Sequence, residues 1–210
     1  MALIMIDELL KIAKKSKTSQ PTLRTVNYWT IDNIQYSGVT DRHRAMIVKG
    51  GHVNDFGGVN ATISVDNGLP VDVNYPNLAR IVPDNIHNSG EIEFFTNATE
   101  IIKSFGKVVK VTMIESDTDI AVYGTNEDNT KTESRFIGKM LHKYNNRGDD
   151  GIEISFNSKY LIDVIDLIKK YSKDKTYNGV VTWGFIDELY PVRIDFGSDI
   201  TYVLTPIRTY

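Results

Sequence analysis

The chain has 210 residues, a formal net charge of −3, 41% hydrophobic residues, 24% charged residues and no cysteine. This length suits one or two domains, and the composition is that of a folded protein and excludes global disorder. The lack of cysteine excludes a disulfide framework, a thiolate metal site and a cysteine nucleophile. Taken as a single number, the mild negative charge argues against a nucleic-acid partner.

The first part of the chain predicts one helix followed by short strands. Residues 4–16 carry apolar side chains at i, i+3, i+4 and i+7, with lysines off that stripe. From residue 22 onwards this helical spacing ends, and residues that favour β-strands predominate. The further predictions are a turn at Ile31–Ile34, strands at 36–39 and 44–48, a loop at 49–58, a strand at 61–65, a turn at 66–68 and an extended passage at 75–83.

The second part of the chain predicts two helices between strands. Residues 91–95 alternate as a strand, and Asn97 with Glu100 matches a capping box that begins a helix reaching Lys110. Asn157–Ser172 is the strongest helical pattern. The other predictions are strands at 108–114, 120–124, 134–140, 151–156, 180–185, 192–196 and 202–204, with polar turns or loops at 116–119, 126–132 and 145–151.

This order of elements predicts an α+β fold with an internal two-fold repeat over about 91–210. The first 83 residues hold about one such repeat and a remnant. We therefore expect an abbreviated domain over 1–88 and a complete domain over 89–210.

Several classes of function find no support in the sequence. There is no P-loop, Gly-x-Gly-x-x-Gly or Gly-x-Ser-x-Gly motif, and no catalytic arrangement, so we expect no enzyme activity and no cofactor. The four histidines, His43, His52, His87 and His142, lack metal-ligand spacing, so we expect no metal site. Asp117 and Asp119 suit a turn better than a calcium loop. Trp29 and Trp183 suit a core better than a nucleotide platform.

The N-terminus lacks a basic region before its few apolar residues, and no stretch has the ~18 apolar residues of a membrane span. We expect no membrane partner and a cytoplasmic location.

Four segments carry a resemblance to a known family. Thr40-Asp-Arg-His-Arg-Ala45 resembles the Thr-Asp-Gly-His-Arg-Leu segment of bacterial sliding clamps, the DNA polymerase III beta subunit. Tyr75-Pro-Asn-Leu-Ala-Arg-Ile-Val-Pro83 is similar to that family's Phe-Pro-Asp-Tyr-Arg-Arg-Val-Ile-Pro connection between its second and third domains. Ile154–Asp163 is similar to its Phe-Asn-x-x-Tyr-Leu-Leu-Asp helix start, and Tyr202–Arg208 resembles its terminal Tyr-Val-x-Met-Pro-Met-Arg.

The resemblance implies a DNA-clamp fold of two clamp-like domains, each with helices packed on an antiparallel sheet. The first domain is abbreviated, and the family's own first domain has no counterpart. Some bacteriophages encode short, two-domain clamps, which implies a phage or prophage origin and then a location in the host cytoplasm. Six domains complete the family's ring, so two domains per chain imply a homo-oligomer, a trimer.

A clamp encircles duplex DNA without reading its sequence, so its pore needs only Lys and Arg for phosphate attraction. Segments 1–17, 97–110 and 159–175 each carry a net charge of +2, which leaves −9 on the rest of the chain. Lysine is also common on any solvated helix face, so the simpler interpretation of these charges is an ordinary surface with no role in DNA binding. The candidates for DNA-facing residues are Lys11, Lys14, Lys15, Lys103, Lys107, Lys110, Lys169, Lys170 and Lys173.

The resemblance also implies a groove between the two domains that captures short peptides of the polymerase and the clamp loader. Aliphatic walls and a few polar groups suit such a peptide. The matched positions are Thr40, His43, Arg44, Pro76, Arg80, Ile81, Asn157, Tyr160, Val203, Thr205, Pro206 and Arg208. The sequence departs from the family at two positions, because Arg42 stands where the family has Gly and Thr205 where it has Met.

The leading hypothesis is therefore a DNA polymerase processivity factor. The first alternative is a clamp-derived interaction or decoy protein that binds clamp-motif peptides without encircling DNA. The second is a phage accessory or structural subunit that shares only the fold.

Overall fold

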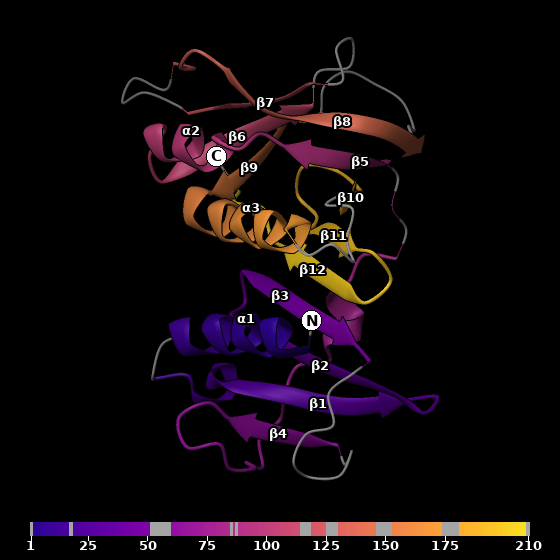
Figure 1. Ribbon diagram of the computed structural model, residues 1–210. Helices are drawn as coiled ribbons and strands as arrows, with labels where there is room; N and C mark the ends of the chain where they lie inside the picture. Colours follow the sequence, from indigo (N-terminus) through magenta and orange to yellow (C-terminus); the bar gives the residue numbers. More distant parts are fainter. Residues whose placement is uncertain are drawn as a thin grey trace. The chain divides into compact units, whose positions relative to one another are not determined.

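The computed structural model describes residues 2–16, 19–50, 60–84, 86, 88–113, 119–124, 130–145, 153–173 and 181–208 (Figure 1). It contains helices α1 (Ala2–Lys15), α2 (Ala98–Ser104) and α3 (Ser158–Ser172), and short 3-10 helices at Pro21–Arg24 and Leu78–Ile81. The strands are β1 (Thr25–Ile31), β2 (Ile34–Thr40), β3 (Arg44–Lys49), β4 (Ala61–Ser64), β5 (Asn88–Phe94), β6 (Val108–Met113), β7 (Asp119–Tyr123), β8 (Arg135–Asn145), β9 (Glu153–Asn157), β10 (Val181–Phe185), β11 (Val192–Phe196) and β12 (Ile200–Leu204).

The chain forms two compact units. Unit 1 contains residues 1–82 together with 198–203, and unit 2 contains residues 83–197 together with 204–210. A segment close to the C-terminus therefore belongs to the N-terminal unit, where β12 lies beside β3. Local sequence patterns carry no signal for this return, because strand pairing across such a separation depends on tertiary packing.

Unit 1 is a mostly antiparallel sheet in the order β4-β1-β2-β3-β12, with α1 packed against β1 and β2. The predicted turn after Ile31 is confirmed: Asp32 and Asn33 both have positive φ, at 51° and 61°. Two such residues make the tight hairpin turn whose twist matches that of its strands.

The two faces of the unit 1 sheet differ. Strand residues alternate between faces, and one set, Val26, Val39, Met46 and Val48, is almost completely buried. Among the α1 residues whose side chains are described, Leu9, Ile12 and Ala13 are buried. The opposite face carries Asn27, Trp29, Tyr36, Gly38, Ala45 and Ile47, and we call it the helix-free face because α1 does not lie on it, although the short 3-10 helix Leu78–Ile81 packs there.

One pattern of elements, strand, helix and three strands, begins at β5 and again at β9, and most of its last strand, β12, belongs to unit 1. The strands of unit 2 follow the order β11-β10-β5-β8-β7-β6-β9, and α2 packs against α3. This confirms the predicted α+β fold with an internal repeat. The buried face of α3 consists of Ser158, Leu161, Val164, Ile165, Leu167, Ile168 and Tyr171. Burial of each large apolar side chain contributes about 1.5–3 kcal/mol, so α3 is a principal part of the core.

Trp183 is a core residue of unit 2, as predicted. It is 3% exposed and lies between Phe94 and Phe156, with ring centroids 5.9 and 6.2 Å away. Trp29 differs, because it is only half-buried on the helix-free face of unit 1.

Three local predictions were wrong. Asn97 makes no side-chain capping bond, so the capping box is not formed. The helix ends at Ser104 and not at Lys110, because Gly106 has a φ of 88° and β6 begins at Val108. The passage at 75–83, predicted to be extended, contains the 3-10 helix Leu78–Ile81. The Asn77 side chain caps the start of this helix by accepting a hydrogen bond from the Ala79 amide. The predicted loops and turns at 49–58, 116–119, 126–132 and 145–151 lie mostly outside the described residues.

The two helix-start asparagines give a matched test. Asn157 accepts a hydrogen bond from the Lys159 amide at 3.0 Å, whereas Asn97 caps nothing. We expect Asn157→Ala to lower the free energy of unfolding by ~1 kcal/mol, the usual cost of a lost N-cap. Asn97→Ala should change it by less than about 0.3 kcal/mol, and Asn157→Asp should restore most of the loss. Urea denaturation measures all three variants, and equal losses at the two asparagines would contradict the assignment.

Candidate peptide-binding and DNA-facing surfaces

The Thr40–Arg44 turn between β2 and β3 is held by its own side chains. The Asp41 carboxylate accepts hydrogen bonds from the backbone amides of His43 and Arg44, both at 3.1 Å. The Thr40 hydroxyl donates to the Arg44 carbonyl at 2.8 Å and accepts from the Arg42 amide at 3.1 Å. Side chains of Asp and Thr commonly stabilise turns in this way, so the Thr-Asp-x-His-Arg pattern has a structural cause.

Arg44 is a buried cation. Its side chain is 1% exposed, and Nε donates to the Asp41 carboxylate at 2.9 Å. Its guanidinium also lies 3.5 Å from the Tyr202 hydroxyl on β12. A charge this deeply buried needs a paired and hydrogen-bonded partner, and Asp41 is such a partner for Arg44.

A small apolar cluster covers the helix-free face beside this turn. Its buried members are Ala45, Ile47, Leu78 and Val203, and Trp29, Tyr36, Tyr75 and Val82 pack against it. Gly38 leaves the room for this packing, because a Cβ there would lie 2.5 Å from Leu78 Cδ1. The rings of Trp29 and Tyr36 stack with centroids 5.6 Å apart. The cluster brings β1, β2, β3, β12 and the Leu78–Ile81 helix together.

Tyr75 attaches the segment before this helix to the turn. Its hydroxyl accepts a hydrogen bond from the Thr40 amide at 3.1 Å. Burial raises the pKa of Tyr75 well above its ordinary value, although the bond from Thr40 acts in the opposite direction. The hydroxyl therefore stays neutral throughout the physiological range.

The structure distributes the predicted peptide-binding residues between the units. In unit 1, Thr40, Arg44 and Val203 are buried supports, while the exposed residues are His43, Pro76, Arg80 and Ile81. In unit 2, Asn157 and Tyr160 stand at the start of α3, and Thr205, Pro206 and Arg208 follow β12. The amide of Ile207 donates to the Ser155 carbonyl at 2.8 Å, which places this terminal segment beside β9.

Sequence reasoning missed the aromatic part of the unit 1 surface. Trp29, Tyr36 and Tyr75 all contribute to it, and none was among the predicted site residues. The alternation of side chains along β1 and β2 places Trp29 and Tyr36 on one face. This alternation is the feature of the sequence that could have identified them.

The predicted DNA-facing lysines fall into different environments. On the helices, Lys11, Lys14, Lys15, Lys103 and Lys170 are exposed. Lys107 precedes β6, and Lys173 caps the end of α3. Lys169 donates to the Thr96 carbonyl at 2.6 Å and lies 3.3 Å from the Thr99 hydroxyl, so it connects α3 to the start of α2.

Lys110 does not lie on a helix, contrary to the prediction. It belongs to β6 and pairs with Glu153 on β9 at 2.9 Å, and Lys131 pairs with the other Glu153 oxygen at 2.9 Å. Partial burial would raise the pKa of Glu153, but the surrounding Tyr123, Lys110 and Lys131 lower it to about 2. The Lys131 ammonium also lies 4.7 Å from the centre of the Tyr123 ring.

Among the described residues, no three metal-ligating side chains gather into a possible ion site. None of the described helices has the length and apolar character needed to cross a bilayer.

Comparison with known proteins assigns the fold. No protein-family model and no curated protein matches the sequence. Among solved structures, a Caulobacter crescentus beta sliding clamp matches 99% of this chain with a TM-score of 0.74 and 15% identity. The chain has the sliding-clamp fold.

Other sliding clamps agree with this assignment. The DNA polymerase sliding clamp of Bacillus subtilis matches 100% of the chain at a TM-score of 0.73 and 17% identity, and the DNA polymerase III beta chain of Streptococcus pneumoniae matches 99% at 0.72 and 17%. The chain spans 63% of the length of each of these three clamps. The resemblance read from four short segments is thus confirmed at the level of the fold, in an abbreviated form.

The first departure from the clamp pattern has a backbone consequence. Arg42 has a φ of 77°, a left-handed conformation that costs an L-residue other than Gly roughly 1 kcal/mol or more. We expect Arg42→Gly to raise the free energy of unfolding by about 0.5 kcal/mol, because relief of this strain exceeds the entropy that Gly loses on folding. Arg42→Ala keeps the strain and serves as the control. A Gly variant no more stable than the Ala variant would contradict the argument.

The Glu153 environment predicts a pH-dependent contribution to stability. The pKa of Glu153 is lower in the folded chain than in the unfolded chain, so its stabilising effect is fully present above pH ~4.5 and is lost as the pH falls toward 2. After allowance for solvent screening at this partly exposed site, we expect Glu153→Gln to cost about 1 kcal/mol at pH 7. Urea denaturation of both proteins at pH 7, 4 and 2.5 measures this. A cost that stays constant with pH would contradict it.

Proposed function

We propose that this chain is a non-catalytic, clamp-like processivity factor that encircles duplex DNA as a homo-oligomer and tethers replication proteins. The observation that carries the proposal is the sliding-clamp fold over 99% of the chain. Both units take part in that match, so the likeness is not confined to one common motif.

The exposed helix lysines support the DNA-facing part of the proposal. Lys11, Lys14 and Lys15 of α1 and Lys103 of α2 are all exposed. A sliding protein needs such sequence-independent attraction to phosphates. Fewer lysines remain as candidates for contacting DNA than the sequence indicated. Lys110 pairs with Glu153 on a strand, and Lys169 is bonded to Thr96 and Thr99.

The turn and the apolar cluster of unit 1 support the tethering part. Peptide sites combine apolar walls with a few fixed polar groups, and the cluster around Leu78 and Val203 adjoins the ordered Thr40–Arg44 turn. We propose this surface of unit 1 as a binding surface for short peptides. The predicted peptide-binding residues of unit 2, which stay a prediction, are Asn157, Tyr160, Thr205, Pro206 and Arg208.

Two units per chain suggest a trimer, which would supply six clamp units. Light scattering at micromolar concentration should then give three times the chain mass of 23.7 kDa. On a tethered duplex, blocking both DNA ends should prolong retention of the protein compared with one open end. A monomer without salt-dependent DNA retention would contradict encirclement and favour a protein that binds peptides only.

Lysine variants test whether DNA binding depends on the helix lysines in particular or only on the total charge of the protein. We expect Lys14→Gln with Lys103→Gln to reduce the salt dependence of DNA binding by about one to two ion equivalents. The matched control is Lys49→Gln with Lys139→Gln, which removes the same charge from exposed strand positions. Equal effects of the two pairs would contradict a DNA-facing role for the helices.

A further inference from the structure

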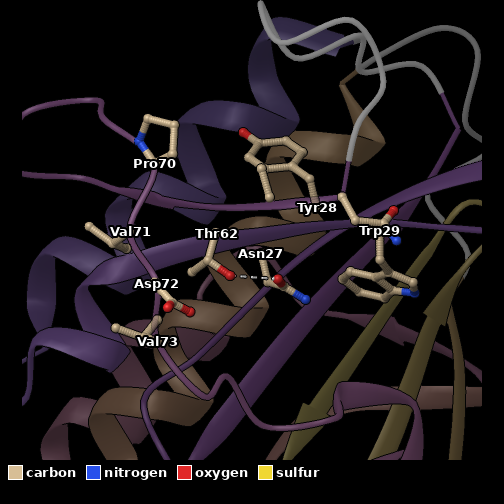
Figure 2. A pocket seen from close by; sticks show the side chains of 10 residues that line it. Asn27, Tyr28, Trp29, Thr62, Pro70, Val71, Asp72 and Val73 are labelled. Carbon is tan, nitrogen blue, oxygen red and sulfur yellow. Dashed lines mark hydrogen bonds between the residues drawn. The ribbon is translucent and has the colours of Figure 1, made fainter.

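Unit 1 contains a pocket beside the apolar cluster, and Trp29 belongs to both. It has a volume of about 600 Å³ and is lined by residues 27–29 of β1, 60–62 at β4 and 70–73. This lies within the ordinary range of 300–1,000 Å³ for ligand pockets. Figure 2 shows the hydrogen-bonded pair of Asn27 and Thr62 with Trp29 on one side and Val71, Asp72 and Val73 on the other.

The floor of the pocket is fixed by strand pairing. Asn27 and Thr62 are opposite each other in the β1–β4 register, and the Thr62 hydroxyl donates to the Asn27 side-chain oxygen at 2.9 Å. This bond orients the Asn27 amide, and its NH2 group has no hydrogen-bond partner among the described residues. An oriented amide with two unused protons is a donor for a peptide carbonyl.

The wall opposite Trp29 is also held in place. The Val71 amide donates to the Thr62 carbonyl at 2.8 Å, and the Ser64 amide donates to the Leu69 carbonyl at 2.9 Å. Residues 69–71 therefore run back along β4. Since these backbone bonds exist before any ligand arrives, binding would cost little further ordering.

The charge of the pocket selects its ligand. Among the described residues that line the pocket, Asp72 is the only carboxylate and none is a cation, and Asp72 is exposed. The opposite wall is the Trp29 indole, the aromatic group that attracts cations most strongly. Stacking on Tyr36 holds this ring in place, at 12° between the ring planes. A carboxylate facing an indole across a polar floor suits a guanidinium on an extended peptide.

We propose that this pocket binds an arginine side chain of a partner protein's extended segment. Asp72 is the counter-ion, the Trp29 ring contacts the planar guanidinium, and the Asn27 amide donates to the carbonyl of the bound peptide. Val71 and Val73 contact the apolar residues that flank the arginine. The site lies wholly within unit 1 and requires neither DNA nor ring closure.

The test uses the full chain and two peptides that differ only in charge. One is acetyl-Gly-Leu-Arg-Leu-Gly-amide, and the other carries citrulline in place of arginine, which keeps the shape and removes the charge. NMR titration should shift the Trp29 indole and the Asn27 side-chain amide with the arginine peptide. We expect the citrulline peptide to bind at least tenfold more weakly, and the difference to shrink in high salt.

Matched variants locate the charge. Asp72→Asn should weaken the arginine peptide about tenfold and leave the citrulline peptide unchanged. Asp32→Asn, in the exposed β1–β2 turn, removes the same charge elsewhere in the unit and should have no effect. Equal affinity for the two peptides, no binding of either at millimolar concentration, or equal effects of the two variants would each overturn the proposal.

Discussion

The buried guanidinium of Arg44 is the constraint on which unit 1 depends. Removing a cation from water costs several kcal/mol, and only close partners offset that cost. Asp41 provides the charge, and Tyr202 provides a hydroxyl from β12, a strand 158 residues further along the chain. Such pairs add little net stability compared with apolar residues, but an unpaired charge is strongly disfavoured. The pair therefore selects the one arrangement of turn and strand in which both partners reach the guanidinium.

That constraint explains why two short sequence segments far apart in the chain belong to one surface. The turn begins at Thr40 and the terminal strand carries Val203, and both meet at the apolar cluster beside Leu78. With the turn fixed by Asp41 and the segment before Leu78 attached through Tyr75, this surface is ordered without a ligand. A preformed surface suits a protein that exchanges short peptide partners, because little ordering remains to oppose each association.

Most of the elements could be predicted from local chemistry, and the errors have physical causes. The stripe of α3 and the tight turn at Asp32 and Asn33 are local, so the sequence predicted both. Asn97 is a residue type that often caps a helix, but its backbone does not have the conformation of a cap. An N-cap residue usually has an extended backbone, whereas the ψ of Asn97 is 8°. Lys110 follows Lys103 at helical spacing, yet Gly106 interrupts the helix between them.

The net charge of each helix is smaller in the structure than the sequence segments indicated. The three segments of +2 included residues beyond the helices, and over the observed bounds α1 and α3 each carry +1 while α2 is neutral. The helices therefore differ from the rest of the chain less than the sequence suggested. Surface position, and not the sum over a segment, distinguishes Lys14 and Lys103 from Lys110. The aromatic surface of Trp29, Tyr36 and Tyr75 also escaped prediction, because its members come from β1, β2 and the segment before Leu78 and meet only in the folded unit.

The return of residues 198–203 to unit 1 has a consequence for biosynthesis. During translation β3, whose residues 44–48 are buried in the folded unit, emerges long before β12. At ~5–20 residues per second, the ribosome needs on the order of ten seconds to make the intervening chain. Throughout that interval the β3 edge is an unpaired apolar strand of the kind that templates association between chains. Unit 1 is therefore incomplete until residues 198–203 have been made, and loss of this short segment would damage a unit whose other residues lie more than a hundred positions earlier in the chain.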